Sequence, residues 1–543
     1  MALALPRYET NQLISIIGSK RPISDSLRLI LSSLTPRRGT PLFLDPFCGS
    51  GVVSRLARGM GMAVRAGDTQ PFSYLINHVY LSLENDDLNP MLPEMGGLDA
   101  YFSLLNMQGL FASESASALA RPFLSRYYAP QDDEDYDGKR ERLFFTAANA
   151  RFLDAVREVI ETDWIEGRIS ANEKAVVLAS ILYEASRKAN TSGSFTAYHK
   201  SFAGAGNVIR KRIVEPCLLT PPVLPDAEVP RGEMNLCEAS KFVKRSSADI
   251  CYLDPPATVH QYGSTYHLLN TITMWDDFSP SNQRDKEGQL LSKAGIRSDW
   301  KQTHSPFCSL SKADKAFVHL LGSIDARHIV LTYPASGIVE IERIHELLMP
   351  RHQPVTVIPL YKRNQGGRQR VAGNKNVEYV FITGKSEGLQ VPVGTGLKIL
   401  PLMERLDELS AAVFRTPQNL PPFQFIGGLM LDGLPRGDVL LNMALADLEK
   451  QVAVLEKSSC TTEEEALEIL VAACVGLGPE MEGKARARLE KRLYALLRKI
   501  TEKHTLDKVE MFLAQSNGDV LACQRIKSFL NMRGEQKKCE GLG

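Results

Sequence analysis

The chain has 543 residues, of which 44% are hydrophobic and 23% are charged, and its 64 Lys and Arg nearly balance its 63 Asp and Glu. At roughly 100 to 200 residues per domain, this length predicts about three folding units with cores of their own, which excludes a disordered, collagen-like or small disulfide-stapled protein. The formal net charge of +1 argues against a uniformly basic coat for nucleic acid, although it does not locate the charges.

The nine cysteines are scattered, with no CxxC pair and no Cys/His cluster at the spacing of zinc ligands. This pattern predicts reduced thiols and no metal site. The N-terminal stretch MALALPRYET is too short for a secretory signal, and no apolar run approaches the roughly 18 residues of a membrane span. We therefore expect a cytoplasmic protein that does not contact a membrane.

The first recognisable unit lies between residues 41 and 68. Residues 41–47 (PLFLDPF) form a short apolar run that is followed by CGSG, and apolar residues then recur at helical spacing up to residue 60. Residues 63–68 (AVRAGD) read as a second strand that again ends in a carboxylate. Strand, glycine turn, helix and strand together make a βαβ unit of the length of a nucleotide-binding half.

The remainder of the chain alternates between helical and sheet patterns. Long amphipathic segments between residues 84 and 215 predict a helical insertion, and sheet signals return at 249–256, 328–334, 355–360 and 377–383. A Pro/Gly-rich stretch at 416–437 precedes a helical tail whose segment 484–503 carries eight Lys/Arg and two Glu. We divide the chain into a first core part (1–83), a helical insertion (84–232), a second core part (233–385) and a helical extension (386–543).

Two features of the glycine turn point to a ligand. Gly49 and Gly51 let the backbone turn tightly and approach a bound molecule, and the helix that follows directs N–H groups toward it. Asp45 lies at the strand end where open α/β sheets bind ligands, and Asp68 at the next strand end can accept both hydroxyls of a ribose. The pattern predicts a cofactor that contains adenosine, although such a turn also occurs for structural reasons alone.

The sequence DICYLDPPATVHQYG carries the second chemical signal. Asp254 ends an apolar strand, and Pro255 and Pro256 fix the backbone and remove two N–H donors, which leaves carbonyl groups and one carboxylate. A site that only accepts hydrogen bonds suits a substrate that offers an NH₂ group.

Taken in order, these motifs resemble those of the Dam-like adenine-specific DNA methyltransferases, most of all those of type IIS restriction-modification systems. IIGSKRPI matches the family's lysine-bearing first segment, LDPFCGSG its cofactor motif and LDPPA its catalytic motif; QYGSTYHLLNTI, SPFC, LTYPASGI, NVEYVFI and, inside the insertion, NTSGSFTAYHK match further segments. The similarity extends over most of residues 8–384. It implies an α/β fold with a Rossmann-like S-adenosylmethionine (SAM)-dependent methyltransferase sheet, a helical target-recognition insertion and a C-terminal helical extension.

The resemblance also assigns residues to the cofactor. It implies that Ser19 and Lys20 lie near the methionine end of SAM and that Asp68 holds the ribose. The cofactor motif contributes a further set to the same site: Asp45, Pro46, Phe47, Gly49 and Gly51. The family's third acid, which contacts the adenine of SAM, aligns with Cys237, so that Glu238 or a backbone group would have to replace it.

The implied reaction transfers the methyl group of SAM to the exocyclic amine of an adenine in a specific duplex DNA sequence, after the base has been extruded from the duplex. Asp254 and the Pro255 carbonyl would accept hydrogen bonds from that amine. The family has an aromatic residue after the two prolines, where this chain has Ala257. Loss of base stacking costs about 1–3 kcal/mol, so productive occupancy would fall by roughly one to two orders of magnitude.

Tyr262 does not obviously replace the missing ring, because the family has a tyrosine there as well. Ala257 is either natural in a weak or non-catalytic member or was introduced deliberately, and we favour the second reading. Two rival functions stay open: methylation of the exocyclic amine of cytosine, and a non-catalytic subunit of a defence complex that binds SAM and DNA.

The segment 361–376 contains five basic residues and no acid, and it reads either as a solvated hairpin tip or as a clamp on DNA phosphates. We favour the clamp. Together with Tyr262, the predicted DNA-binding residues are Lys362, Arg363, Arg368, Arg370 and Lys375. The polar stretch 279–304 is expected to be a loop that orders on substrate, and the extension to contact a partner nuclease or a second copy of the chain.

Overall fold

The computed structural model describes residues 7–35, 39–115, 119–202, 207–226, 228–245, 247–349, 355–361 and 377–384, and beyond these mainly 445–459, 462–476 and 483–499. The chain divides into two compact units. Met1–Val355 and Tyr379–Gly388 form the first unit, and Thr356–Glu378 and Leu389–Gly543 form the second. The division of the chain into four domains stays a prediction.

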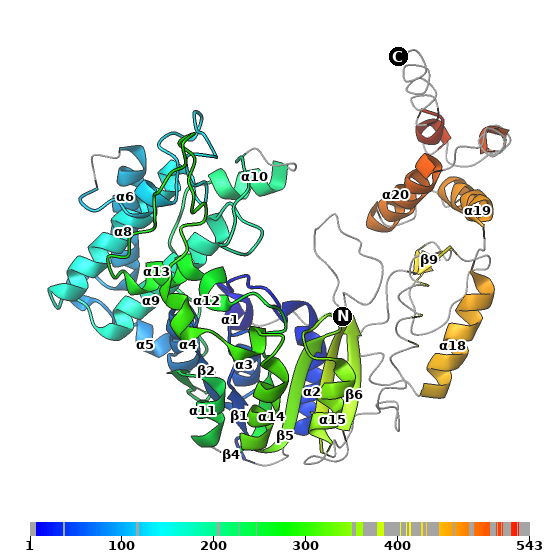
Figure 1. Ribbon diagram of the computed structural model, residues 1–543, viewed down its shortest axis with the longest axis horizontal. Coiled ribbons are helices and arrows are strands. Elements are labelled where there is room, and N and C mark those ends of the chain that lie inside the picture. The colour runs from blue at the N-terminus through cyan, green and yellow to red at the C-terminus, as the bar shows by residue number, and fades with distance from the viewer. Residues whose placement is uncertain are drawn as a thin grey trace. The chain divides into compact units, whose positions relative to one another are not determined.

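A seven-stranded sheet organises the described residues of the catalytic part (Figure 1). Its strands are, in spatial order, β3 (Glu233–Leu236), β2 (Ala63–Asp68), β1 (Leu42–Asp45), β4 (Ser247–Leu253), β5 (Asp325–Pro334), β7 (Val377–Thr383) and β6 (Val355–Tyr361). The five strands from β3 to β5 pair in parallel. The chain order runs outward in both directions from the β1–β4 boundary, and such a switch point is where open α/β sheets bind ligands at their carboxyl edge.

The predicted α/β fold class is confirmed, and the predicted strands coincide with β1, β2, β4, β5, β6 and β7 to within a few residues. Strand β3 was not predicted. It has four residues, and Met234 is the only one of them that is buried, so the strand lacks the run of apolar residues by which sequence reasoning finds buried parallel strands.

Helices that precede and follow the glycine turn in the chain form a layer against the sheet. Helix α3 (Val52–Gly59) contacts β1 and β2, α4 (Pro71–Ser82) contacts β2 and β3, and α2 (Ser24–Leu34) packs on α3. Farther along the chain, α14 (Ala313–Ser323) packs on α11 (Ala239–Phe242) and α15 (Ile341–Leu348).

Two buried arginines of α3 tie the N-terminal segment to this layer. The Arg55 guanidinium lies 3.4 Å from the centre of the Tyr80 ring and donates to the Asn11 carbonyl. Arg58 donates to the Tyr80 carbonyl, and the Tyr8 hydroxyl of α1 (Arg7–Thr10) donates to the same oxygen. The chain that leads into residues 16–20 is therefore anchored on α3 and α4.

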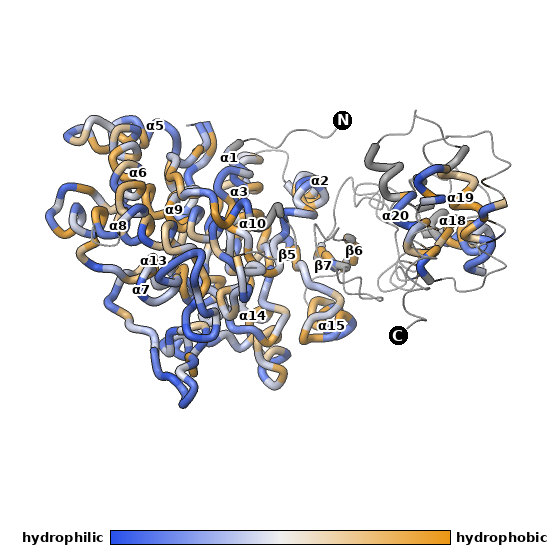
Figure 2. The backbone as a smooth tube through the Cα atoms, turned by 90° about the horizontal axis from the view of Figure 1, so that it is seen from above, coloured by the Kyte–Doolittle hydropathy of each residue, from blue (hydrophilic) through white to orange (hydrophobic). Residues whose placement is uncertain are grey.

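The helical insertion contains α5 (Asn85–Leu88), α6 (Leu98–Glu114), α7 (Leu124–Tyr127), α8 (Ala147–Ile165), α9 (Ala171–Lys188) and α10 (Asn207–Val214). The Thr146 hydroxyl caps α8, and Ser170 and Glu173 form a reciprocal capping box on α9. Helix α6 packs on α8, α8 on α9, and α9 on α4 of the sheet layer. Hydrophobic and hydrophilic residues alternate along α6 and α8 (Figure 2), as expected of helices that bury one face.

After β4 the chain forms α12 (Tyr262–Thr265) and α13 (His267–Met274), and α13 packs on both α4 and α9. The polar stretch that follows is fastened by two arginines. Arg297 is paired with Asp276 and Asp299, and Arg142 from the insertion donates to carbonyls of this stretch. Short turns of 3₁₀ helix complete this unit at Arg21–Ile23, Pro93–Met95, Val243–Arg245, Asp299–Thr303 and Pro306–Cys308.

The second unit has a hydrophobic core of its own. Its described elements include the helices α18 (Leu445–Ser458), α19 (Glu463–Gly476) and α20 (Gly483–Lys499) and a two-stranded ladder of β8 (Phe425–Ile426) and β9 (Met430–Leu431). Leu467 and Leu470 of α19 and Leu493 and Leu497 of α20 are fully buried in one cluster. The predicted helical extension is thus confirmed. None of the described helices is long and apolar enough to span a bilayer.

Candidate active site

One cavity of about 250 Å³ opens at the β1–β4 switch point. Six stretches of chain line it: residues 16–20, the glycine turn after β1, the end of β2, residues 238–240, the end of β4 with the start of α12, and residues 302–307. The described structure thus brings the first two matched motifs together with the catalytic motif, which lies about 200 residues farther along the chain.

Asp45 forms the buried floor of this cavity. Its side chain is 1% exposed and accepts hydrogen bonds from the Ser54 hydroxyl (2.6 Å) and the Phe47 N–H (3.2 Å). Burial raises the pKa of Asp45 to about 7, against the opposing effect of these two donors. Asp45 therefore joins the glycine turn to α3 through its hydrogen bonds. Pro46 and Phe47 lie beside it in the cavity wall.

Both predicted glycines have backbone conformations that favour glycine, with φ of 55° at Gly49 and 80° at Gly51. A Cβ on Gly49 would lie 2.9 Å from Ile16 Cδ1, and a Cβ on Gly51 would overlap Asn77 Oδ1. Asn77 also donates to the Gly49 carbonyl at 3.0 Å. Gly49 lines the cavity, whereas Gly51 does not; close packing against α4 explains the second glycine.

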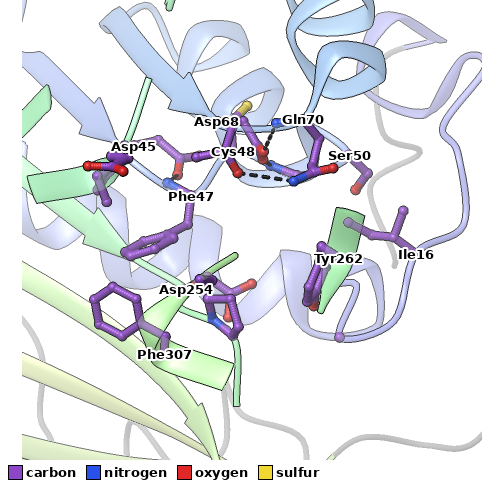
Figure 3. Close-up of a pocket in the computed structure, with 18 of the residues that line it drawn as sticks. Ile16, Asp45, Phe47, Cys48, Ser50, Asp68, Gln70, Asp254, Tyr262 and Phe307 are labelled. Atoms are coloured by element: carbon purple, nitrogen blue, oxygen red, sulfur yellow. Dashed lines mark hydrogen bonds between the residues drawn. The ribbon is translucent and has the colours of Figure 1, made fainter. Parts of the chain in front are cut away.

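Asp68 fixes the opposite side of the turn. Its two carboxylate oxygens accept the N–H groups of Gly49 (2.9 Å) and Gln70 (2.8 Å), as Figure 3 shows. Burial raises the pKa of Asp68, and the backbone donors partly offset that effect. Because a carboxylate offers about four lone-pair positions, these two bonds leave Asp68 able to accept hydroxyl groups from the cavity as well.

Asp254 enters the cavity from the end of β4. The Lys20 ammonium lies 2.6 Å from Asp254 Oδ1, and the Thr332 hydroxyl of β5 donates to the same oxygen at 3.2 Å. The Lys20 side chain is 5% exposed and that of Asp254 is 25% exposed, so this ion pair is largely removed from water. Lys20 also donates to the Gly18 carbonyl at 2.8 Å. The predicted N-terminal lysine is thus joined directly to the predicted catalytic carboxylate.

The other residues of the second motif lie differently. Pro256 lines the cavity, but Pro255 and Ala257 are not among its lining residues. Pro255 is buried and Ala257 is half-buried, with its carbonyl accepting the Ile338 N–H at 3.2 Å. This bond fixes the backbone after the prolines to the loop that follows β5.

Tyr262 closes the side of the cavity near the N-terminal segment (Figure 3). Its hydroxyl donates to the Ile17 carbonyl at 3.1 Å, and the Tyr266 hydroxyl accepts the Ile17 N–H at 2.6 Å. Burial raises the pKa of the Tyr262 hydroxyl well above its ordinary value, so it stays protonated and acts as a donor. Residues 16–20, including the cavity-lining Ser19, are therefore held over the site by α12 and the residue after it.

The cavity also contains residues that were not predicted. Phe307, from the SPFC segment, meets Phe47 edge to face with ring centres 5.2 Å apart, and Gln302 and His304 line the outer wall. The match of SPFC to the family motif was the one signal that could have identified Phe307. Glu238 lines the cavity, whereas Cys237 does not; the Cys237 N–H donates to the Asp68 carbonyl.

The five basic residues of the predicted clamp, Lys362, Arg363, Arg368, Arg370 and Lys375, lie outside the described residues. Strands β6 and β7 on either side of them are described and are neighbours in the sheet, as the predicted hairpin requires.

Comparison with known proteins agrees with this geometry. Residues 17–297, just over half of the chain, match the family of D12 class N6 adenine-specific DNA methyltransferases. The chain is 26% identical over 378 residues to the type II methyltransferase M.NlaIII of Neisseria lactamica, which covers 69% of this chain and all of that protein.

Other relatives are longer than the region they share with this chain. The type II methyltransferase M.FokI of Planomicrobium okeanokoites is 26% identical over 386 residues, which is 70% of this chain and 54% of that protein. Modification methylase LlaI of Lactococcus lactis subsp. lactis is 28% identical over 312 residues, or 56% and 44% of the two chains. The chain thus spans about half the length of these two relatives. The cavity carries the cofactor motif and the catalytic motif, and the family match covers both; the protein belongs to the D12 class of N6 adenine-specific DNA methyltransferases, enzymes that methylate adenine in DNA.

Proposed function

We propose that this chain transfers a methyl group from SAM to N6 of adenine within a specific duplex DNA sequence, in the cavity at the β1–β4 switch point. The observation that carries the proposal is the meeting of Asp254 with Asp68 and the glycine turn in one cavity. The Asp254 carboxylate, which can accept hydrogen bonds from an amine, and the glycine turn with Asp68, which can bind a nucleoside, thus line the same cavity.

The lining residues suit SAM as the methyl donor. Asp68 can accept ribose hydroxyls, Glu238 and its neighbours can contact the adenine, and Phe47 and Phe307 offer aromatic surfaces. When bound, SAM supplies an electrophilic methyl group, and no Lewis acid is needed for its transfer.

Asp254 is the residue that we assign to the target amine. The adenine must leave the duplex to reach it. A carboxylate held by Lys20 and Thr332 keeps a fixed orientation, so it can accept a hydrogen bond from the N6 amine and direct the nitrogen lone pair at the methyl carbon. We assign the second acceptor to the Pro255 carbonyl. Lys20 acts here as a positioning residue rather than as a contact of the methionine end alone.

Ala257 weakens this reaction because it offers no ring on which the extruded base can stack. We propose that Tyr262, which borders the cavity, contacts the DNA without restoring that ring. A non-catalytic role in binding SAM and DNA is the second candidate, and Ala257 is the observation in its favour. Whether the alanine is natural or introduced, the cavity retains its acceptors.

Labelled methyl transfer to duplex DNA tests the proposal, with three forms of the full chain: the chain itself, Ala257→Tyr and Ala257→Tyr with Asp254→Asn. We expect Ala257→Tyr to raise the rate by roughly one to two orders of magnitude, the equivalent of the lost stacking. Asp254→Asn should abolish that gain and leave SAM binding intact, because it removes the charge of one acceptor. If none of the three forms transfers a methyl group while SAM still binds, the result would favour the non-catalytic candidate.

The partners follow from the same reading. Duplex DNA is the substrate, and we propose an intracellular site of action, with Lys362, Arg363, Arg368, Arg370 and Lys375 clamping its phosphates. Neutralising these five should flatten the salt dependence of DNA binding, and an unchanged slope would refute the clamp. We further propose that the helical extension, residues 386–543, docks a nuclease or a second copy of the chain. Deletion of this extension should leave SAM binding unchanged and abolish any self-association measured by light scattering.

A further inference from the structure

A second cavity, of about 460 Å³, lies between the helical insertion and the polar stretch that follows α13, and it shares no lining residue with the candidate active site. Three separate stretches of chain form it: residues 137–139, residues 196–200 and residues 289–294. All three belong to the first compact unit.

Each of these stretches contributes an exposed lysine to the cavity: Lys139, Lys200 and Lys293. Among the described residues none of the three ammonium groups has a carboxylate partner within 4.0 Å. The one acid of the lining, Asp137, lies 3.5 Å from Arg140 and accepts the backbone N–H of Lys139, so its charge is already engaged. The lining thus carries three lysines against one acid, a positive balance that suits an anionic ligand.

Buried contacts hold the three stretches together. Arg142, 3% exposed, donates to the carbonyls of Lys293, Ser292 and Ser281 at 2.7–3.1 Å. The Leu290 N–H donates to the Lys139 carbonyl at 3.1 Å, and the Tyr198 hydroxyl donates to the Glu141 carbonyl at the same distance. The backbone segments that carry the lysines are thus held together by hydrogen bonds, which lowers the entropic cost of binding an anion there.

The stretch that carries Lys200 also reaches the catalytic part. The Phe195 N–H donates to the Thr265 carbonyl at 2.8 Å, and the Phe195 carbonyl lies 3.0 Å from His267 Nε2. Thr265 and His267 belong to α12 and α13, which begin directly after the catalytic motif. In Figure 1 the green chain of this region runs among the cyan helices of the insertion.

We propose that the cavity of Lys139, Lys200 and Lys293 binds backbone phosphates of the duplex DNA that the active site methylates. This inference rests on the proposed function. Lysines bind phosphates as point charges, and such contacts set the register of a protein on DNA without reading its sequence. Each neutralised phosphate contributes about 0.9 to the slope of log affinity against log salt.

The test compares DNA binding by the full chain and by the triple variant Lys139→Gln, Lys200→Gln, Lys293→Gln over a series of salt concentrations. We expect the salt slope to become less steep by about two to three, and affinity to fall on cognate and unrelated duplexes alike. The matched control carries the same charge change at three exposed lysines elsewhere, Lys244→Gln, Lys315→Gln and Lys457→Gln. The decrease in the salt slope of this control should be less than half of the decrease in the triple variant.

Equal slopes for the triple variant and its control would overturn the proposal. A loss confined to the cognate duplex would also overturn it, because phosphates are common to all sequences. So would a triple variant that binds DNA normally but no longer binds inorganic pyrophosphate, which would assign the cavity to a free anion. If methyl transfer fails in every form but the slope still changes as expected, the phosphate site stands and the enzymatic proposal falls.

Discussion

At the scale of single residues, the site combines one carboxylate that faces the reaction with others that shape it. Asp254 enters the cavity with Lys20 as its ion-pair partner. Asp45 lies at the cavity floor and bonds to its own turn and to α3. Two aspartates at the ends of two strands of one sheet therefore have different environments.

The first prediction concerns Asp45→Asn. Because burial raises the pKa of Asp45 from 3.8 to about 7, the folded state binds a proton more tightly than the unfolded state does. The contribution of Asp45 to the free energy of unfolding should therefore fall as pH rises from about 4 to 7 and level off above that. Relative to the native chain, Asp45→Asn should gain stability over the same window, by roughly 4 kcal/mol at the upper limit. Urea unfolding at pH 5, 6, 7 and 8 measures the difference.

Asp314 provides the control. The Arg343 guanidinium lowers the pKa of Asp314, so the contribution of this carboxylate is present above its unfolded pKa and lost in acid. Asp314→Asn should change stability slightly and in the opposite direction with pH. A pH-independent difference for Asp45→Asn would contradict the assigned environment of Asp45.

At the scale of elements, the turn between β1 and α3 owes its shape to helix α4 as much as to its own sequence. Asn77 of α4 occupies the space that a side chain on Gly51 would need, and it bonds to the Gly49 carbonyl. The glycine pattern was predicted from the sequence and assigned to a tight turn and to close approach of a ligand, not to packing against α4. The neighbour that makes Gly51 necessary lies 26 residues away and could not be identified without the fold.

The second prediction compares Gly51→Ala with Gly61→Ala. Both residues have φ near 80°, at 80° and 85°, so both substitutions incur the left-handed backbone cost of about 1–2 kcal/mol. Only Gly51 also meets a side chain, since nothing lies within 4 Å of a Cβ on Gly61. Gly51→Ala should cost at least about 1–3 kcal/mol more, as overpacking does, and should weaken SAM binding. Urea midpoints and calorimetric SAM titration measure both effects, and equal midpoints for the two variants would refute the clash.

At the scale of the whole molecule, the chain contains two compact units with separate hydrophobic cores. The relative M.NlaIII is matched over its full length by 69% of this chain. About three tenths of the chain therefore lies outside what that methyltransferase shares with it. The second unit has a hydrophobic core of its own, which we expect to be stable by itself.

The third prediction uses one buried leucine from each core. Leu493 and Leu182 are both fully buried, and replacing either by alanine should cost about 2–5 kcal/mol within its own unit. Calorimetry of the full chain should show two transitions, of which Leu493→Ala lowers one and Leu182→Ala the other. SAM binding should survive Leu493→Ala. A single transition that both variants shift equally would show that the two cores unfold together.

The sequence by itself determined the order of the motifs and most of the strands. Apolar runs that end in Asp45, Asp68 and Asp254 are local signals, because a buried parallel strand must be apolar and a ligand-binding residue must follow its carboxyl end. The match of the ordered motifs also identified the family, which the comparison with known proteins confirmed.

Tertiary structure alone decided which of these residues meet. The ion pair of Lys20 with Asp254, the bonds from Tyr262 and Tyr266 to Ile17 and the rings of Phe47 and Phe307 join residues 234, 245, 249 and 260 positions apart. The same holds for the three lysines of the second cavity, which were not predicted as a site. Local patterns report how a segment meets its own neighbours, whereas a site depends on how distant segments pack, and that packing follows from the burial of the whole core.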